Sequence, residues 1–203
     1  MTRLAGIILA GGRSTRMGGQ EKSLLSLAGE TLIGRVARRL LPQTEILAIS
    51  ANGDPNRFAG LGLKVISDTA ISVGPLAGIQ SGLKWAQEQD ATHLLTVAAD
   101  TPFFPLDLAS RLLDASNEVP VMASSDGRLH PVFCLWPVST AQHLSNWLDE
   151  GGSRSVTGFC ESLNYQCVAF DVPVISGMQA DPFFNINTPE DMETAQRLER
   201  LQR

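Results

Sequence analysis

The chain has 203 residues with a formal net charge of −5 at pH 7, and 43% of them are hydrophobic. This length fits one domain that buries its own core, and the composition excludes a disordered or fibrous chain. The acidic balance excludes a uniformly basic nucleic-acid-binding surface. Residues 1–40 nevertheless carry seven basic and two acidic side chains. This local excess predicts a small anionic ligand and no nucleic-acid partner.

The predicted elements of the first half alternate between strands and helices. In chain order they are a strand at 4–10, a helix at 31–41, strands at 45–50 and 63–67, a helix at 76–89, a strand at 93–98 and a helix at 106–115. Short, continuous apolar runs are typical of strands buried in a parallel sheet. The helix at 31–41 repeats its leucines and valine every fourth residue, so we expect Arg35, Arg38 and Arg39 to face outward.

The second half has more hairpin character. Its predicted elements are strands at 119–125 and 132–136, a helix at 139–149, a strand at 166–171 and a final helix that opens at Thr188-Pro189. Asp126-Gly127 is a turn signal between the first two strands. The pattern indicates an α/β fold, a Rossmann-like three-layer sandwich with a mainly parallel sheet and helices on both faces. No linker or repeat divides the chain, so we expect a single domain over residues 1–203.

Cysteine usage and hydropathy bear on location. Cys134, Cys160 and Cys167 show no CxxC spacing, so we expect small buried hydrophobic residues rather than disulfides or a zinc site. The first apolar run, 4–10, is followed by glycines, and no run approaches the 18 residues that would span a membrane. We expect a cytoplasmic protein with no membrane partner.

A glycine-rich loop follows the first strand. Residues 9–22 contain four glycines and three cations, Arg13, Arg16 and Lys22. The loop leaves the carboxyl end of a strand, where open α/β sheets bind ligands, and its glycines let backbone N–H groups approach phosphate oxygens. The loop contains no GxGxxG pattern. It also lacks the Walker pattern, because Glu21 rather than glycine precedes Lys22. The loop predicts a phosphate cradle, and a surface loop with solvated arginines is the alternative.

Two carboxylates are expected at the same edge of the sheet. Asp68 and Asp100 each follow a predicted strand. Asp100 is our first choice for Mg²⁺, which takes one or two carboxylates together with phosphate oxygens and waters. Asp68 is assigned to the ligand, because a carboxylate can accept two hydrogen bonds at once, and the metal is a lesser option for it. Each aspartate could instead be a turn residue, and Gly74–Gly78 could be an ordinary helix start rather than an anion site.

These segments together resemble the molybdenum cofactor guanylyltransferases, a branch of the nucleotidyltransferases. The matching residues are Leu9-Ala10-Gly11-Gly12 with Arg16 and Lys22, Asp68, Gly74-Pro75-Leu76-Ala77-Gly78, Asp100-Thr101-Pro102 and Asn185-Ile186-Asn187-Thr188-Pro189-Glu190-Asp191. The resemblance spans nearly the whole chain and implies a fold of the nucleotide-diphospho-sugar transferase type. It departs at Ser50, where the family tends to carry asparagine in the nucleotide pocket, and Asn52 lies two residues further on. A serine offers only a hydroxyl, so we expect weaker contacts to the base there.

The resemblance implies transfer of GMP from GTP to the terminal phosphate of Mo-molybdopterin, with release of pyrophosphate. Residues 1–116 would bind GTP and residues 117–203 the acceptor. The implied catalytic residues are Lys22, Arg16 and Asp100, and Asp100 would also be the ligand of Mg²⁺ or Mn²⁺. The implied nucleotide-binding residues are Leu9, Ala10, Gly11, Gly12, Lys22, Ser50, Asp68, Gly78 and Asp100. Weaker signals assign five residues to the acceptor: Arg128 and His130, in the predicted turn between the strands at 119–125 and 132–136, and Arg154, Asn185 and Asn187. Arg128 could instead be a solvated turn residue, and Asn187-Thr188 could be a helix cap.

Two alternatives to this function remain open. One is a nucleotidyltransferase with another base or acceptor, such as a cytidylyltransferase acting on molybdopterin or a sugar-phosphate nucleotidyltransferase. Gly74–Gly78 disfavours the first, and the short C-terminal half disfavours the second. The other is a GTP-binding regulatory module without turnover. We expect a monomer that makes transient contacts with molybdenum cofactor biosynthesis proteins and acceptor enzymes.

Overall fold

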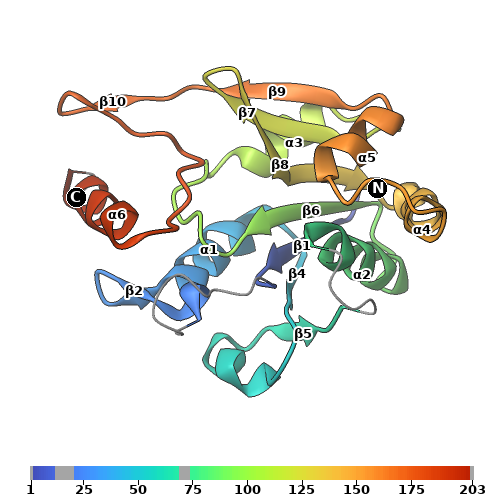
Figure 1. Ribbon diagram of the computed structural model, residues 1–203, viewed down its shortest axis with the longest axis horizontal. Coiled ribbons are helices and arrows are strands. Elements are labelled where there is room, and N and C mark those ends of the chain that lie inside the picture. The colour runs from blue at the N-terminus through green and yellow to red at the C-terminus, as the bar shows by residue number, and fades with distance from the viewer. Residues whose placement is uncertain (1, 12–20, 69–73, 202–203) are drawn as a thin grey trace.

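A seven-stranded sheet forms the centre of the computed structural model, which describes residues 2–11, 21–68 and 74–201 (Figure 1). Its strands, in spatial order, are β5 (Lys64–Ile66), β4 (Ile46–Ser50), β1 (Leu4–Leu9), β6 (His93–Ala98), β8 (Arg128–Pro137), β7 (Val121–Ser125) and β9 (Gln166–Phe170). Neighbouring strands are parallel except where β8 pairs with β6 and β7. The predicted mainly parallel sheet is confirmed.

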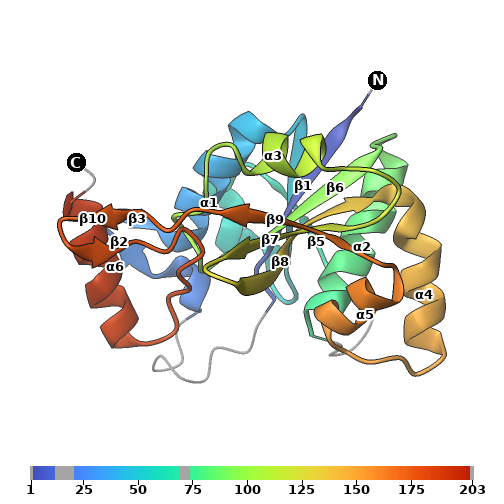
Figure 2. The same cartoon turned by 90° about the horizontal axis from the view of Figure 1, so that it is seen from above.

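Helices cover both faces of this sheet (Figure 2). They are α1 (Leu32–Leu40), α2 (Pro75–Glu88), α3 (Leu108–Asp114), α4 (Ala141–Asp149) and α5 (Val156–Ser162). The chain also forms α6 (Pro189–Leu201), which packs outside these two cores, and the short 3₁₀ helices η1 (Lys22–Leu24), η2 (Leu41–Gln43), η3 (Pro55–Leu61) and η4 (Val138–Thr140). Strand β1 shows how the cores divide: Leu4 and Ile8 pack with α1 and α3, whereas Ala5 and Ile7 pack with α2, α4 and α5. Successive side chains of this buried strand therefore pack into two different cores, one on each face of the sheet. The predicted three-layer sandwich is confirmed.

A third apolar cluster joins the C-terminal helix to the first half of the chain. In both views α6 lies beside the small hairpin of β2 (Ser26–Leu27) and β3 (Glu30–Thr31) (Figures 1 and 2). Arg35 of α1 reaches into this junction, donating to the carbonyl of Leu27 at 3.1 Å and lying 2.6 Å from the carboxylate of Glu199. The prediction that Arg35 faces outward is wrong, because α6 covers that side of α1.

The other two arginines of α1 differ from each other. Arg39 is half-buried and donates to the carbonyl of Phe104 at 2.8 Å, so it does not face solvent freely either. The Arg38 side chain is 63% exposed and pairs with Glu30, as expected for a surface position. A helical repeat of leucines identified the main buried face of α1 but gave no sign of the second contact made by its flank.

Every helix and strand predicted from the sequence is present, with ends within two residues except the start of β8. That strand begins at Arg128, directly after a two-residue turn in which Asp126 and Gly127 have φ of 46° and 72°. Two positive φ values are typical of the tight hairpin turn that Asp-Gly predicts. The elements that sequence patterns missed are short: α5, the β2–β3 hairpin, and the hairpin of β10 (Val174–Ile175) and β11 (Met178–Gln179).

The cysteine prediction holds for two of the three residues. Cys134 and Cys160 are buried, whereas Cys167 is exposed on the edge strand β9, so its predicted burial is wrong. All three thiols are free, as predicted. Over residues 2–11, 21–68 and 74–201, no helix combines the length and apolar character needed to cross a membrane.

Candidate nucleotide site

Four parallel strands end side by side at one edge of the sheet, in the order β5-β4-β1-β6. Asp68, Gly11 and Asp100 each lie two residues beyond the end of their strand, and Ser50 is the last residue of β4. Because the carboxyl ends of parallel strands share an edge, these residues face the place where open α/β sheets bind ligands. The site divides into two clusters, one around Asp68 and one around Lys22.

The carboxylate of Asp68 is held by two side chains that follow β4. Ser50 Oγ donates to Asp68 Oδ1 at 3.0 Å, and Asn52 Nδ2 donates to Asp68 Oδ2 at 3.0 Å. Asn52 Oδ1 also accepts the backbone N–H of Asp68 at 2.9 Å. The amide of Asn52 therefore clasps both the side chain and the backbone of Asp68, and the orientation of the carboxylate is fixed before any ligand arrives. Sequence reasoning noted Asn52 but gave it no role.

Gly78 keeps this cluster compact, and Gly11 lies beside it. A Cβ on Gly78 would lie 2.6 Å from Ser50 Oγ and 2.9 Å from Leu9 Cδ2, so only glycine lets α2 approach the ends of β1 and β4. A Cβ on Gly11 would lie 3.7 Å from Asp68 Oδ2, which places this backbone beside the carboxylate. The structure thus brings together the five predicted residues Leu9, Gly11, Ser50, Asp68 and Gly78. Ala10 joins them through its N–H, which donates to the carbonyl of Ser50 at 2.9 Å.

Lys22 forms the second cluster with residues that are distant in sequence. Its Nζ lies 2.5 Å from Asp100 Oδ2, 2.5 Å from Asn187 Oδ1 and 3.2 Å from Asn185 Oδ1. The three oxygens match the three donors of an ammonium group. Lys22 and Asp100 are mostly buried here, with side chains 16% and 21% exposed. Two predicted catalytic residues therefore meet in one ion pair.

The two asparagines were predicted to contact the acceptor, and sequence reasoning did not connect them with Lys22. Their spacing indicates only that the two side chains point the same way, as alternate residues of an extended segment do. Capping had been the alternative for Asn187-Thr188. Thr188 Oγ1 accepts from the N–H of Asp191 at 3.1 Å, and Asp191 Oδ2 accepts from the N–H of Asn187 at 2.8 Å. This capping box uses the backbone of Asn187 and leaves its side chain directed at Lys22.

The oxygens around Lys22 also bear on the predicted metal. Asp100 offers a carboxylate, and Asn185 and Asn187 offer amide oxygens, the hard donors that Mg²⁺ prefers. Among the described residues, no group of three or more His, Cys, Asp or Glu side chains could hold a metal ion. A single carboxylate suits Mg²⁺, which completes its coordination with waters and substrate phosphates. The residues present therefore fit the metal predicted for Asp100.

Three residues of the predicted cradle, Gly12, Arg13 and Arg16, lie outside the described residues. Their roles stay predictions.

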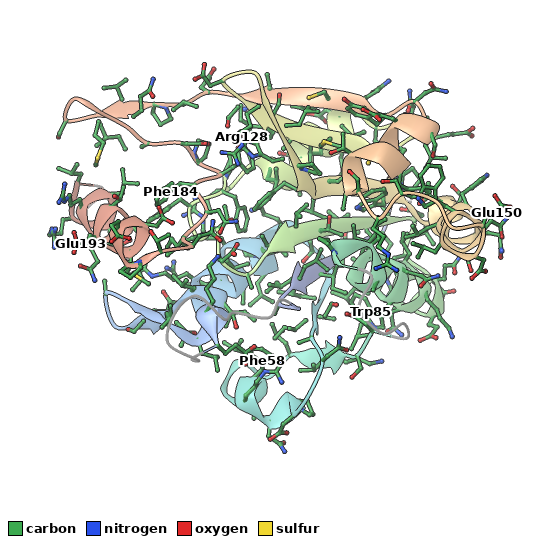
Figure 3. The ribbon with its side chains drawn as sticks, viewed as in Figure 1. Phe58, Trp85, Arg128, Glu150, Phe184 and Glu193 are labelled. Carbon is green, nitrogen blue, oxygen red and sulfur yellow. The ribbon has the colours of Figure 1, made fainter. Side chains whose placement is uncertain are left out.

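The predicted acceptor residues of the second half have different surroundings. Arg128 is exposed at the start of β8, on the same side of the molecule as Phe184, which precedes Asn185 (Figure 3). Arg154 is also exposed. His130 lies within β8 rather than in the turn, is buried, and stacks on Phe183 with ring centroids 4.4 Å apart. Its predicted place in an exposed turn is wrong, because β8 starts earlier than its apolar run.

The buried imidazole of His130 fastens the hairpin to the segment that leads to Asn185. Its Nε2 lies 2.6 Å from Ser125 Oγ, and that hydroxyl donates to Asp181 Oδ1 at 2.9 Å. Asp181 Oδ1 in turn accepts the N–H of Phe183 at 2.9 Å. His130 therefore supports the fold behind the Lys22 cluster.

Burial gives His130 a measurable effect on stability. Burial lowers its pKa, an effect that Asp181 partly opposes, and burial also lowers the pKa of His93. Because the folded state favours neutral imidazole, the unfolded chain binds more protons as the pH falls through about 6.5. We expect the free energy of unfolding to fall between about pH 7.5 and 6, by at most about 1.4 kcal/mol per pH unit for each imidazole.

Urea unfolding at both pH values measures this dependence. His130→Gln should weaken it, whereas His143→Gln, at an exposed helix position, should leave it unchanged. The same pH dependence in both variants and the parent chain would contradict the role given to His130.

Comparison with known proteins identifies the family of this chain. Residues 6–165 match the MobA-like NTP transferase domain. A molybdenum cofactor guanylyltransferase of Mesorhizobium japonicum is 46% identical, over 96% of this chain and 95% of the relative. One of Cereibacter sphaeroides is also 46% identical, over 98% of both chains.

A solved structure extends the comparison to the fold. The molybdopterin-guanine dinucleotide biosynthesis protein A of Archaeoglobus fulgidus superposes with a TM-score of 0.71, at 24% identity, over 97% of this chain and 98% of the other. The sandwich is therefore shared even where sequence identity is low. From the domain match and the nearly full-length similarity to its relatives, the chain belongs to the molybdenum cofactor guanylyltransferase family of nucleotidyltransferases.

Proposed function

We propose that this chain transfers GMP from GTP to the terminal phosphate of Mo-molybdopterin, forming molybdopterin guanine dinucleotide and pyrophosphate. The observation that carries the proposal is the meeting of Lys22, Asp100, Asn185 and Asn187 at the sheet edge that also holds Asp68. The oriented carboxylate of Asp68 and the ammonium of Lys22 suit the two ends of a nucleoside triphosphate. Membership of the family, with relatives named for this activity, supports the same substrates.

The reaction needs alignment and charge neutralisation more than proton transfer. A terminal phosphate oxygen of the acceptor attacks the α-phosphorus of GTP, a new P–O bond forms, and the bond between the α-phosphorus and the bridging oxygen breaks. The electron pair leaves with pyrophosphate. Since the attacking oxygen is already anionic at neutral pH, no strong general base is required. Positioning and electrostatic stabilisation then supply the rate.

At the phosphate end, we assign Lys22 and Arg16 to neutralise the triphosphate and the departing pyrophosphate. The backbone from Leu9 to Gly12 would hold the nucleotide, since glycine allows close approach to phosphate oxygens. Lys22 reaches this site as a compact point charge, and Asp100 balances its charge. The ammonium is thereby held at the strand edge where the phosphates would bind.

We assign Mg²⁺ to Asp100, with Asn185 and Asn187 as further oxygen donors, and Mn²⁺ suits the same donors. Lys22, which these three oxygens hold in the structure, would then pair with the phosphates instead. The ion would supply positive charge next to the α-phosphate. The chain contributes the position of Asp100, two residues beyond β6, and the capping box that sets the direction of the Asn187 side chain.

At the base end, Asp68 would accept from the N1–H and the 2-amino group of guanine. The clasp of Ser50 and Asn52 keeps its carboxylate in one orientation. Gly78 leaves room for this arrangement at the start of α2. The second half of the chain, with exposed Arg128 and Arg154, would receive the acceptor. We propose that the enzyme works in the cytoplasm as a monomer that contacts cofactor-handling proteins transiently.

The direct test incubates the chain with GTP, Mg²⁺ and Mo-molybdopterin and measures both pyrophosphate release and the guanine dinucleotide product by mass. Product from GTP, and none from CTP, is the expected result. Transfer of CMP would point to a cytidylyltransferase. Nucleotide binding without pyrophosphate release would point to a regulatory module.

Asp100→Asn tests the metal assignment. The substitution keeps the size of the side chain but removes its charge, so we expect half-maximal activity to need at least about tenfold more Mg²⁺. The melting temperature should change little, because Asp100 is partly exposed and asparagine can still accept a hydrogen bond from Lys22. Asp107→Asn, at an exposed position, is the matched control. An unaltered Mg²⁺ titration would reject the metal role of Asp100.

A further inference from the structure

The guanidinium of Arg57 joins the two clusters of the site from outside. Arg57 belongs to η3, between β4 and β5, and its side chain is 22% exposed. One terminal nitrogen donates to the carbonyl of Asn52 at 2.6 Å, and the other donates to the carbonyl of Asp54 at 2.8 Å. Its Nε lies 2.6 Å from the carboxylate of Glu21. All three nitrogens of one side chain are therefore engaged, each with a different residue.

The first connection leads to the base end of the site. Asn52 is the residue that clasps Asp68, and Arg57 fixes the backbone of Asn52 from the opposite side. Gly53 follows with φ of 88°, and a Cβ there would lie 3.1 Å from Arg57 Nη1. The backbone at this turn is thus closely fitted to the guanidinium. A shift of Asn52 would turn the carboxylate of Asp68 with it.

The second connection leads to the phosphate end. Glu21 immediately precedes Lys22, and its carboxylate also accepts from the hydroxyl of the buried Ser23 at 3.2 Å. The contact of Arg57 Nε with Glu21 is an ion pair without an aligned hydrogen bond, because that N–H does not point along the short contact. The pair anchors the chain just before η1, which begins at Lys22.

The packing around Arg57 favours a fixed guanidinium. Its carbon Cζ lies 4.6 Å from the centroid of the Phe58 ring, and Phe58 is buried, with 1% of its surface exposed (Figure 3). Asp54 caps the start of η3 by accepting the N–H of Asn56 at 2.9 Å. The helix that carries Arg57 is thus anchored at its first turn and by an aromatic residue in the core.

We infer that Arg57 is a positioning residue of the nucleotide site, which sets base selection through Asn52 and Asp68 and sets the approach of Lys22 through Glu21. This inference rests on the proposed function, since it takes guanine as the base that Asp68 reads. The two connections predict separable effects. Loss of the Asn52 connection should reduce the preference for GTP over ATP, whereas loss of the Glu21 connection should lower turnover with that preference retained.

Lysine cannot replace arginine in both connections. An ammonium on a flexible stem can still pair with Glu21, but it lacks the planar set of donors that reaches two carbonyls at once. Arg57→Lys should therefore restore turnover relative to Arg57→Ala without restoring base preference. If Arg57 had only a structural role, Arg57→Lys would restore turnover and base preference together.

The experiment measures kcat and KM for GTP and for ATP with Asn52→Ala, Glu21→Gln, Arg57→Ala and Arg57→Lys, after thermal melts confirm that each chain folds. We expect Asn52→Ala and Arg57→Ala to reduce the GTP/ATP ratio of kcat/KM by roughly tenfold, the effect of about one lost hydrogen bond. Glu21→Gln should lower kcat about fivefold with the ratio unchanged. Arg38→Ala, an exposed ion-paired arginine on α1, is the matched control and should behave as wild type.

Calorimetric titration of the same chains with GTP and with ATP, without acceptor, separates the inference from the proposed function. A wild type that prefers GTP in binding but transfers nothing would overturn the proposed function and leave the inference standing. Equal losses for GTP and ATP in Asn52→Ala and Arg57→Ala, in binding and in turnover, would overturn the inference. An Arg57→Lys chain that regains base preference would also overturn it.

Discussion

Replacing Lys22 with alanine should lower GMP transfer by roughly 100-fold or more, which corresponds to about 3 kcal/mol of lost transition-state stabilisation. The ammonium is the one cation that the described part of the site brings within 2.5 Å of Asp100, beside the edge where the phosphates would lie. Its removal leaves developing charge on the pyrophosphate without a point-charge partner. The loss should therefore fall on kcat more than on the binding of GTP.

Single-turnover kinetics with and without acceptor measures this loss. Lys84→Ala, an exposed lysine on α2, is the matched control and should retain full activity. The Lys22 side chain is mostly buried and contacts Asp100, Asn185 and Asn187, so we expect its loss to lower the stability of the chain but not to unfold it. Because Lys22 also joins segments on either side of Asp100, a thermal melt has to accompany the assay. Activity within threefold of wild type would reject the assigned role.

Strand ends explain why so much of this site could be predicted from sequence. Asp68, Asp100 and the glycines after β1 follow apolar runs, and parallel strands bring such positions to one edge. Local patterns therefore sufficed to place residues almost 100 positions apart in one site. The same logic predicted the three layers, because each run in β1, β4 and β6 is apolar on both faces.

The contacts that sequence patterns missed depend on tertiary packing. Arg35 was predicted at the surface because its pattern on α1 gives no sign that α6 covers it. His130 was predicted in a turn because β8 extends beyond its apolar run. Asn185 and Asn187 reach Lys22 only because the segment before α6 crosses to the edge of the sheet. No local periodicity records such a crossing, so these partners could not be paired from the sequence.

The departure from the family at Ser50 has a physical reading in the structure. A serine hydroxyl is shorter than an asparagine amide, yet it still donates to one oxygen of Asp68. Asn52 holds the other oxygen, so both are occupied by donors from the same strand end. Ser50 therefore acts on the base through Asp68, because Ser50 and Asn52 together set the orientation of that carboxylate.

The wild-type chain should prefer GTP over ATP by roughly 10⁴-fold in kcat/KM, because a carboxylate accepts from two donors of guanine and finds no such donors at the same edge of adenine. Guanine donates from N1 and the 2-amino group, whereas adenine presents an unprotonated N1 whose lone pair the carboxylate repels. Asp68 is the candidate reader, and its two oxygens are already oriented by Ser50 and Asn52. Asp68→Ala should therefore lower the use of GTP far more than the use of ATP.

Values of kcat/KM for GTP, ATP and CTP with both proteins measure this preference, and Asp114→Ala, at the exposed end of α3, is the control. Equal losses for GTP and ATP would move Asp68 from the base to the ribose, the metal or the fold, and a wild-type preference for CTP would overturn guanylyl transfer.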